Sequence, residues 1–137
     1  MLIRMPSPQH ILVAEDNPDD ASIFRLMYQR ATLPHAVHFV EDGQQVIDWL
    51  SGAERFSDRT KYPIPDRVLL DLKMPGKDGF EALEWIRGQT AFKDLPVIIL
   101  SSSDDQRDIK RAYELGATTY FVKSPQLKDV LQYLRPS

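Results

Sequence analysis

Five short runs of aliphatic and β-branched residues are spread along the chain. They cover residues 11–14, 36–40, 68–70, 97–100 and 119–122. Most of these runs are continuously apolar, which is typical of strands that are covered on both faces in a parallel sheet. The second run is interrupted by His38, so we expect that strand to lie at an edge of the sheet or to be half exposed.

The segments that separate these runs show helical periodicity. They cover residues 19–31, 43–50, 80–86, 105–115 and 127–134. The last of them places Leu127, Val130, Leu131 and Leu134 at the spacing of an amphipathic helix. Strand and helix therefore alternate five times. This alternation predicts an α/β fold, a single doubly wound sheet of five parallel strands with helices on both faces.

Length and composition limit the class of protein. The chain has 137 residues, which is the usual size of one domain, and 42% of them are hydrophobic, which argues against disorder. The long polar stretch 51–65 is interpreted as a surface loop and not as an interdomain linker, because neither side of it could form a complete sheet alone. We therefore predict a single domain over residues 1–137, with a core from about 10 to 135 and no output domain.

Charge and cysteine content exclude several kinds of site. The net charge is −3, so the basic excess typical of nucleic-acid-binding domains is missing. The chain has no cysteine, which excludes disulfides, thiolate metal sites and cysteine nucleophiles. The longest apolar runs have the length of strands, and the first ten residues lack the apolar stretch of a secretory signal. We expect a cytoplasmic protein that contacts neither membrane nor nucleic acid.

Polar residues close four of the five apolar runs. Glu15 and Asp16 come after the first run, Asp71 after the third, Ser101 after the fourth and Lys123 after the fifth. In an open α/β sheet all of these positions belong to the edge where ligands bind. The sequence therefore predicts that they form one site.

The chemistry of these side chains points to phosphoryl transfer. Closely spaced carboxylates repel one another unless a cation or a proton neutralises them, and a set of oxygen ligands favours a hard divalent ion such as Mg²⁺. The ammonium of Lys123 suits a phosphate oxygen, and Ser101 adds a hydroxyl donor. A carboxylate between such groups could accept a phosphoryl group.

The chain resembles the response regulator receiver domain. Four segments carry this resemblance in the order and with the spacing of the family: VAEDNP at 13–18, LDLKMPGKDG at 70–79, PVIILSS at 96–102 and GATTYFVK at 116–123. Each motif alone is weak, but the four together are a strong signal that covers about residues 10 to 135. The resemblance implies a flavodoxin-like sheet with the strand order 2-1-3-4-5.

The resemblance also implies roles for the acidic residues. Asp71 matches the aspartate that is phosphorylated, and Glu15 and Asp16 match the acidic pair that binds Mg²⁺. Asp16 is expected to bind the metal directly and Glu15 through water. Asp71 itself and the backbone carbonyl of Lys73 are the further expected metal ligands.

Three other residues match the family's switch. Lys123 matches the lysine that contacts the phosphoryl group, and Ser101 matches the hydroxyl that follows this group. Tyr120 matches the aromatic residue whose ring is linked to that hydroxyl. Phosphorylation is thus expected to be read out through Ser101 and Tyr120.

The chain departs from the family pattern at two places. Ser124 stands between Lys123 and Pro125, where the family usually has lysine followed directly by proline, and the loop 51–65 is longer than usual. Both features resemble single-domain regulators that work with phytochrome-type histidine kinases.

The expected function is that of a two-component phosphorelay response regulator. It would accept a phosphoryl group from a sensor histidine kinase or a phosphotransfer protein and act on a downstream protein or a second copy of itself. It would not be an enzyme, apart from catalysing its own phosphorylation and dephosphorylation.

Two alternatives to this function remain open. They are a receiver-like adaptor that binds proteins without phosphorylation and a flavodoxin-like cofactor carrier. The chain lacks the phosphate-cradling loop that such a carrier has after its first strand.

Overall fold

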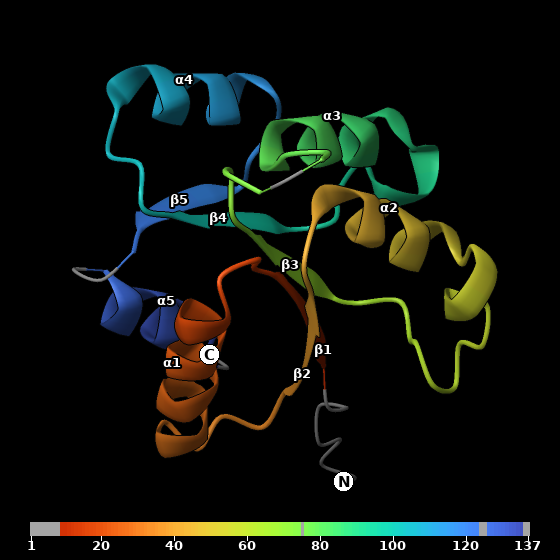
Figure 1. Ribbon diagram of the computed structural model, residues 1–137, viewed down its shortest axis with the longest axis horizontal. Coiled ribbons are helices and arrows are strands. Elements are labelled where there is room, and N and C mark those ends of the chain that lie inside the picture. The colour runs from red at the N-terminus through yellow and green to blue at the C-terminus, as the bar shows by residue number, and fades with distance from the viewer. Residues whose placement is uncertain (1–8, 75, 124–125, 136–137) are drawn as a thin grey trace, which may run out of the picture.

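The computed structural model describes residues 9–74, 76–123 and 126–135, and its centre is one parallel sheet. The strands are β1 (His10–Ala14), β2 (Ala36–Val40), β3 (Arg67–Leu70), β4 (Val97–Ser101) and β5 (Thr119–Val122). They are arranged in the order β2-β1-β3-β4-β5, and all neighbouring pairs are parallel (Figure 1). The predicted fold class and strand order are confirmed, and the strand that contains His38 lies at an edge of the sheet.

The helices cover both faces of the sheet. They are α1 (Pro18–Arg30), α2 (Gly43–Ser51), α3 (Gly79–Gly88), α4 (Gln106–Glu114) and α5 (Leu127–Tyr133). The α1 and α5 helices lie together on one face, and α2, α3 and α4 lie on the other (Figure 1). Short 3-10 helices at Glu54–Phe56 and Thr90–Phe92 follow α2 and α3. No helix in the described ranges has the length and apolar character needed to cross a membrane.

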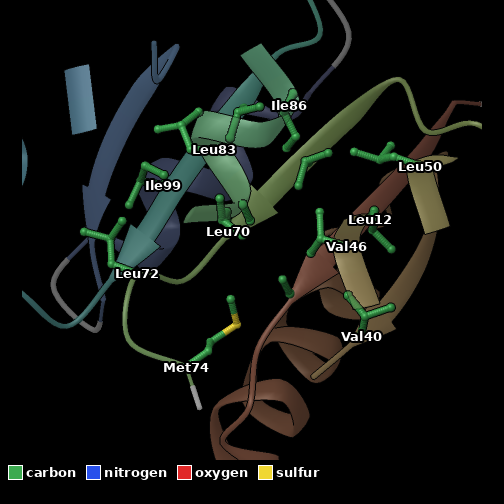
Figure 2. Packing of buried hydrophobic residues seen from close by; sticks show 14 of the residues in the cluster. Leu12, Val40, Val46, Leu50, Leu70, Leu72, Met74, Leu83, Ile86 and Ile99 are labelled. Atoms are coloured by element: carbon green, nitrogen blue, oxygen red, sulfur yellow. The ribbon is translucent and has the colours of Figure 1, made fainter. Parts of the chain in front are cut away.

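Alternating side chains of the strands divide the core into two parts. Leu12, Leu70 and Ile99 are buried towards α2 and α3 and pack with residues such as Leu83 (Figure 2). Ile11, Leu69 and Ile98 are buried on the opposite face, in a cluster with Phe24 of α1 and Val130 of α5. A strand that buries both faces must be apolar at consecutive positions, which explains the continuous apolar runs.

The loop 51–65 folds back on α2 and extends the core on that face of the sheet. The aromatic rings of Trp49, Phe56 and Tyr62 pack against one another, with ring centroids 5.1–5.2 Å apart. The Arg59 guanidinium donates hydrogen bonds to the carbonyls of Trp49 (2.7 Å) and Leu50 (2.9 Å). These are among the last carbonyls of α2, so Arg59 satisfies the acceptors that a helix leaves free at its C-terminal end.

Candidate functional site

Three residues that follow different strands meet at the carboxyl edge of the sheet. The Lys123 Nζ atom lies 2.8 Å from Asp71 Oδ2 and also contacts Glu15 Oε1. Their side chains are 14%, 6% and 7% exposed, respectively. The sequence therefore predicted correctly that these three residues come together, and the structure holds them as a nearly buried ionic cluster.

Backbone hydrogen bonds just beyond the strand ends place these residues side by side along the carboxyl edge of the sheet. The Glu15 amide donates to the carbonyl of Val40 (2.9 Å), and the Asp71 amide donates to that of Ala14 (3.2 Å). On the other side of the site, the Lys123 amide donates to the Ser101 carbonyl (2.8 Å). Each bond continues the ladder of a parallel strand pair by one residue. The register of the sheet therefore decides which side chains surround the site.

A glycine allows the start of α3 to lie against the backbone of Asp71. The Gly79 amide donates to the Leu72 carbonyl at 2.9 Å. A Cβ atom at Gly79 would lie 2.2 Å from the Asp71 carbonyl oxygen and 2.7 Å from the Leu72 Cα atom. Both contacts are with backbone, which cannot turn aside as a flexible side chain can. A larger residue at this position would therefore displace the Asp71 segment.

The acidic residues form a group that suits a divalent cation. Glu15, Asp16 and Asp71 each offer a carboxylate oxygen, and these atoms lie within 4.8 Å of one another. Asp16 is exposed, whereas the other two are buried. The Lys73 amide donates to Asp71 Oδ1 (3.3 Å), which places the Lys73 backbone beside the same carboxylate. An all-oxygen donor set of this kind fits a hard ion such as Mg²⁺ or Mn²⁺.

Burial and the neighbouring charges shift the pKa values at the site. Burial raises the pKa of Glu15 to about 7, and the Asp71 charge acts in the same direction, against the hydrogen bonds from Lys123 and Asn17. Burial alone would lower the pKa of Lys123, but its hydrogen bonds to Asp71 and Glu15 outweigh this effect and raise it. Without a metal ion, Lys123 thus stays charged and neutralises part of the acidic cluster.

This shift predicts that the metal-free protein loses stability between about pH 4.5 and pH 7. Glu15 ionises near 4.5 in the unfolded chain and near 7 in the folded one, so the folded state holds the extra proton in this range. The free energy of unfolding should fall as pH rises, by as much as about 3 kcal/mol at 1.4 kcal/mol per pKa unit. Urea denaturation in the presence of a chelator, at several pH values across this range, measures this change.

The matched variant for this prediction is Glu15→Gln, which should lack the fall. The comparison is needed because His38 acts in the opposite direction: burial and the neighbouring His10 lower the pKa of His38, so its contribution to stability increases with pH. An equal dependence on pH in wild type and Glu15→Gln would contradict the prediction.

Ser101 and Tyr120 both contact the loop between β4 and α4. Ser101 is fully buried at the end of β4, and its hydroxyl accepts a hydrogen bond from the Ser103 amide (3.3 Å). The Tyr120 hydroxyl donates to the Ser103 carbonyl at 2.7 Å. Both predicted switch residues therefore contact the same residue of this loop, which links them through Ser103.

Asp20 also belongs to the site, although the sequence pattern does not assign it there. Its Oδ2 atom lies 3.1 Å from Lys123 Nζ. Asp20 belongs to the first turn of α1 and does not directly follow a strand, so the pattern of polar residues at strand ends does not indicate it. Its sequence signal is its position four residues after Asp16, in the first turn of the helix that Asn17 caps. The departure from the family pattern at Ser124 and Pro125 lies outside the described residues.

Comparisons with known proteins agree with this geometry. The family described as the response regulator receiver domain matches residues 11–135. The response regulator Rcp1 of Synechocystis sp. is 30% identical over 128 residues, which are 93% of this chain and 85% of Rcp1. The structure of Rcp1 in its Mn²⁺-bound form has a TM-score of 0.80 and covers 93% of this chain and 90% of Rcp1.

Two further solved structures are similar over nearly the whole chain. The phosphorylated cyanobacterial phytochrome response regulator RcpA is 32% identical, with a TM-score of 0.82 over 94% of this chain and 90% of RcpA. RPA3017, a response regulator in red light signalling of R. palustris, is 37% identical, with a TM-score of 0.83 over 93% of this chain and 89% of that protein. The chain belongs to the response regulator receiver domain family and is a receiver domain of two-component signalling.

Proposed function

We propose that Asp71 is the residue that accepts the phosphoryl group. The observation that supports this most directly is the buried Asp71 carboxylate, which lies close to the carboxylates of the acidic pair and 2.8 Å from the Lys123 Nζ atom. A carboxylate oxygen attacks the phosphorus atom of a phosphohistidine, and the bond between nitrogen and phosphorus breaks with the electron pair left on the imidazole. The product is an acyl phosphate, which water later hydrolyses.

Mg²⁺ is the cation that we assign to the acidic group. Glu15, Asp16 and Asp71 would hold it together with the backbone carbonyl of Lys73, with Asp16 as a direct ligand and Glu15 acting through water. The donor set consists of oxygen atoms, and the similar Rcp1 has been solved with Mn²⁺. When bound, the cation would neutralise charge on the phosphoryl oxygens.

The remaining residues of the site respond to the new negative charge. Lys123 would leave its contacts with Glu15 and Asp71 and bind a phosphoryl oxygen, since an acyl phosphate offers more negative charge than the carboxylate it replaces. Ser101 would contribute its hydroxyl to the same group. Because Ser101 and Tyr120 both contact Ser103, such a movement would change the loop between β4 and α4.

We infer that the donor is a sensor histidine kinase or a phosphotransfer protein in the cytoplasm. The phytochrome regulators among the similar structures favour a kinase of the phytochrome type. The output is a protein contact, made through a surface of the fold between about residues 10 and 135 with a downstream protein or a second copy of the chain. The net charge of −3 does not favour nucleic acid as a target. In this proposal the domain catalyses only its own phosphorylation and dephosphorylation.

The test of this function is phosphorylation of the wild-type protein by acetyl phosphate, followed by intact-mass spectrometry. With Mg²⁺ we expect one phosphoryl group per chain, released by mild base as an acyl phosphate is. With a chelator in place of the metal, labelling should be lost. If no phosphoryl group is taken up in Mg²⁺, the proposal is wrong, and an adaptor that binds proteins without phosphorylation becomes the favoured alternative.

A further inference from the structure

Lys123 is held by three carboxylates that come from different parts of the fold. Glu15 follows β1, Asp71 follows β3, and Asp20 lies in the first turn of α1. The contact with Asp20 joins residues that are 103 positions apart in the sequence. It connects the start of α1 with the end of β5, two elements that are not neighbours along the chain.

Asp20 differs from the other two partners of Lys123. Glu15 and Asp71 belong, with Asp16, to the group of carboxylates whose oxygens lie close enough to share a cation, and Asp20 does not. A cation bound there would neutralise negative charge on Glu15 and Asp71 that attracts the Lys123 ammonium when no cation is present. The same cation repels the ammonium, since two positive charges a few ångströms apart raise the energy of the site. When a cation occupies the acidic group, Asp20 is the carboxylate of this cluster that remains available to bind the Lys123 ammonium.

The local structure fixes the position of Asp20 in the first turn of α1. The Asn17 side chain caps α1 and accepts hydrogen bonds from the amides of Asp19 (2.9 Å) and Asp20 (3.2 Å). With Pro18 as the next residue, this cap fixes the backbone of the first turn. A side chain on a capped helix is positioned more accurately than one on a free loop. The Asp20 side chain is 41% exposed, so it marks the solvent side of the cluster.

A hollow next to the site limits where the ammonium can go. Glu15, Asp20 and Lys123 line it together with apolar residues of the core between α1 and α5, and its volume is about 260 Å³. The apolar part of its wall includes Val13, Phe24, Leu100 and Leu127. Apolar groups offer a charged amine no hydrogen bonds, so moving into this space is unfavourable for Lys123. If the contact with Asp20 is lost, the favourable alternative for the ammonium is solvent.

We infer that Asp20 is a positioning residue that keeps the Lys123 ammonium at the site when a cation occupies the acidic group. This inference rests on the proposed function, in which Lys123 binds a phosphoryl oxygen. Asp20 lies outside the group of carboxylates that could share a cation, so it would act through Lys123 and not by contact with the metal or the phosphoryl group. The nearest matched position is Asp19, an exposed acid in the same helical turn that is not among the carboxylates on Lys123.

The experiment compares Asp20→Asn with Asp19→Asn in saturating Mg²⁺, with acetyl phosphate as the donor. Both variants lose one negative charge from the first turn of α1. We expect Asp20→Asn to be phosphorylated roughly threefold to tenfold more slowly than wild type, in keeping with the loss of one half-exposed contact to a charged group. Asp19→Asn should react like wild type, and Asp20→Glu should recover part of the rate because it keeps the carboxylate.

A double-mutant cycle separates positioning from a merely structural role. In a Lys123→Gln background, Asp20→Asn should cause no further slowing, because the group it positions is gone. Binding of beryllofluoride, a phosphoryl mimic, should weaken by a similar factor in Asp20→Asn and again show no further effect in the Lys123→Gln background. Circular dichroism and urea unfolding of each variant show whether it is folded.

Two results would overturn the inference: a rate of Asp20→Asn equal to that of Asp19→Asn, or an equal slowing with and without Lys123. Failure of the proposed function looks different, because the wild-type protein itself would then take up no phosphoryl group, and both proposals would fall together.

Discussion

Asp71→Asn should take up no phosphoryl group from acetyl phosphate under conditions in which wild type takes up one. The amide has the size and shape of the carboxylate but lacks the negative oxygen that attacks phosphorus. The substitution should leave the fold intact, because the Lys123 ammonium still has Glu15 and Asp20 as partners. Intact-mass spectrometry of both proteins after the same incubation measures the difference.

The control is the same substitution at Asp104, an exposed acid in the loop after β4 on the same side of the sheet. Asp104→Asn should be labelled like wild type. Equal labelling of Asp71→Asn and wild type would show that the phosphoryl group goes to another residue. The assignment of Asp71 would then be wrong, even if the protein is phosphorylated in a metal-dependent way.

Lys123→Gln should change metal binding and phosphorylation in opposite directions. In the metal-free protein the ammonium neutralises Glu15 and Asp71, so a cation has to compete with it for two carboxylates. Removing this positive charge should tighten Mg²⁺ binding by roughly tenfold. The same variant loses the group that stabilises charge on the transferred phosphoryl oxygens, and the rate of phosphorylation should fall by about a hundredfold.

Calorimetric titration with Mg²⁺ and the initial rate of labelling by acetyl phosphate measure the two effects. Lys128→Gln is the matched control, because it removes the same charge from an exposed position on α5. It should leave both quantities close to those of wild type. If Lys123→Gln binds Mg²⁺ no more tightly than wild type, the ammonium does not compete with the cation. If it is phosphorylated at the wild-type rate, Lys123 has no part in the transfer.

The position of the site could be predicted from the sequence because of the way parallel sheets are built. Every strand of such a sheet has its carboxyl end at the same edge, so residues that follow different apolar runs come together regardless of the helices between them. This reasoning brought Glu15, Asp71 and Lys123 together, and the structure confirms the contacts among them. The strand order, in contrast, came from the resemblance to the receiver family, since apolar runs alone do not say which strands are neighbours.

The sequence did not show how the long loop would be arranged. The composition of residues 51–65 predicts a polar surface loop, but Phe56 and Tyr62 pack on Trp49, and Arg59 binds the end of α2. The hydrophobic residues in this stretch follow neither the two-residue period of a strand nor the 3.6-residue period of a helix. The pattern therefore does not indicate which of its residues are buried. The contacts depend on the direction in which the chain leaves α2.

The sequence by itself determined the succession of strands and helices and the residue types at the carboxyl edge, because both follow from local patterns and from the geometry of a parallel sheet. Only the tertiary structure decided that Lys123 also contacts Asp20 and that Ser101 and Tyr120 meet at Ser103. These contacts depend on how α1 and the β4–α4 loop pack against the sheet. Such packing is the sum of many weak contacts between distant residues, and no local pattern along the chain records it.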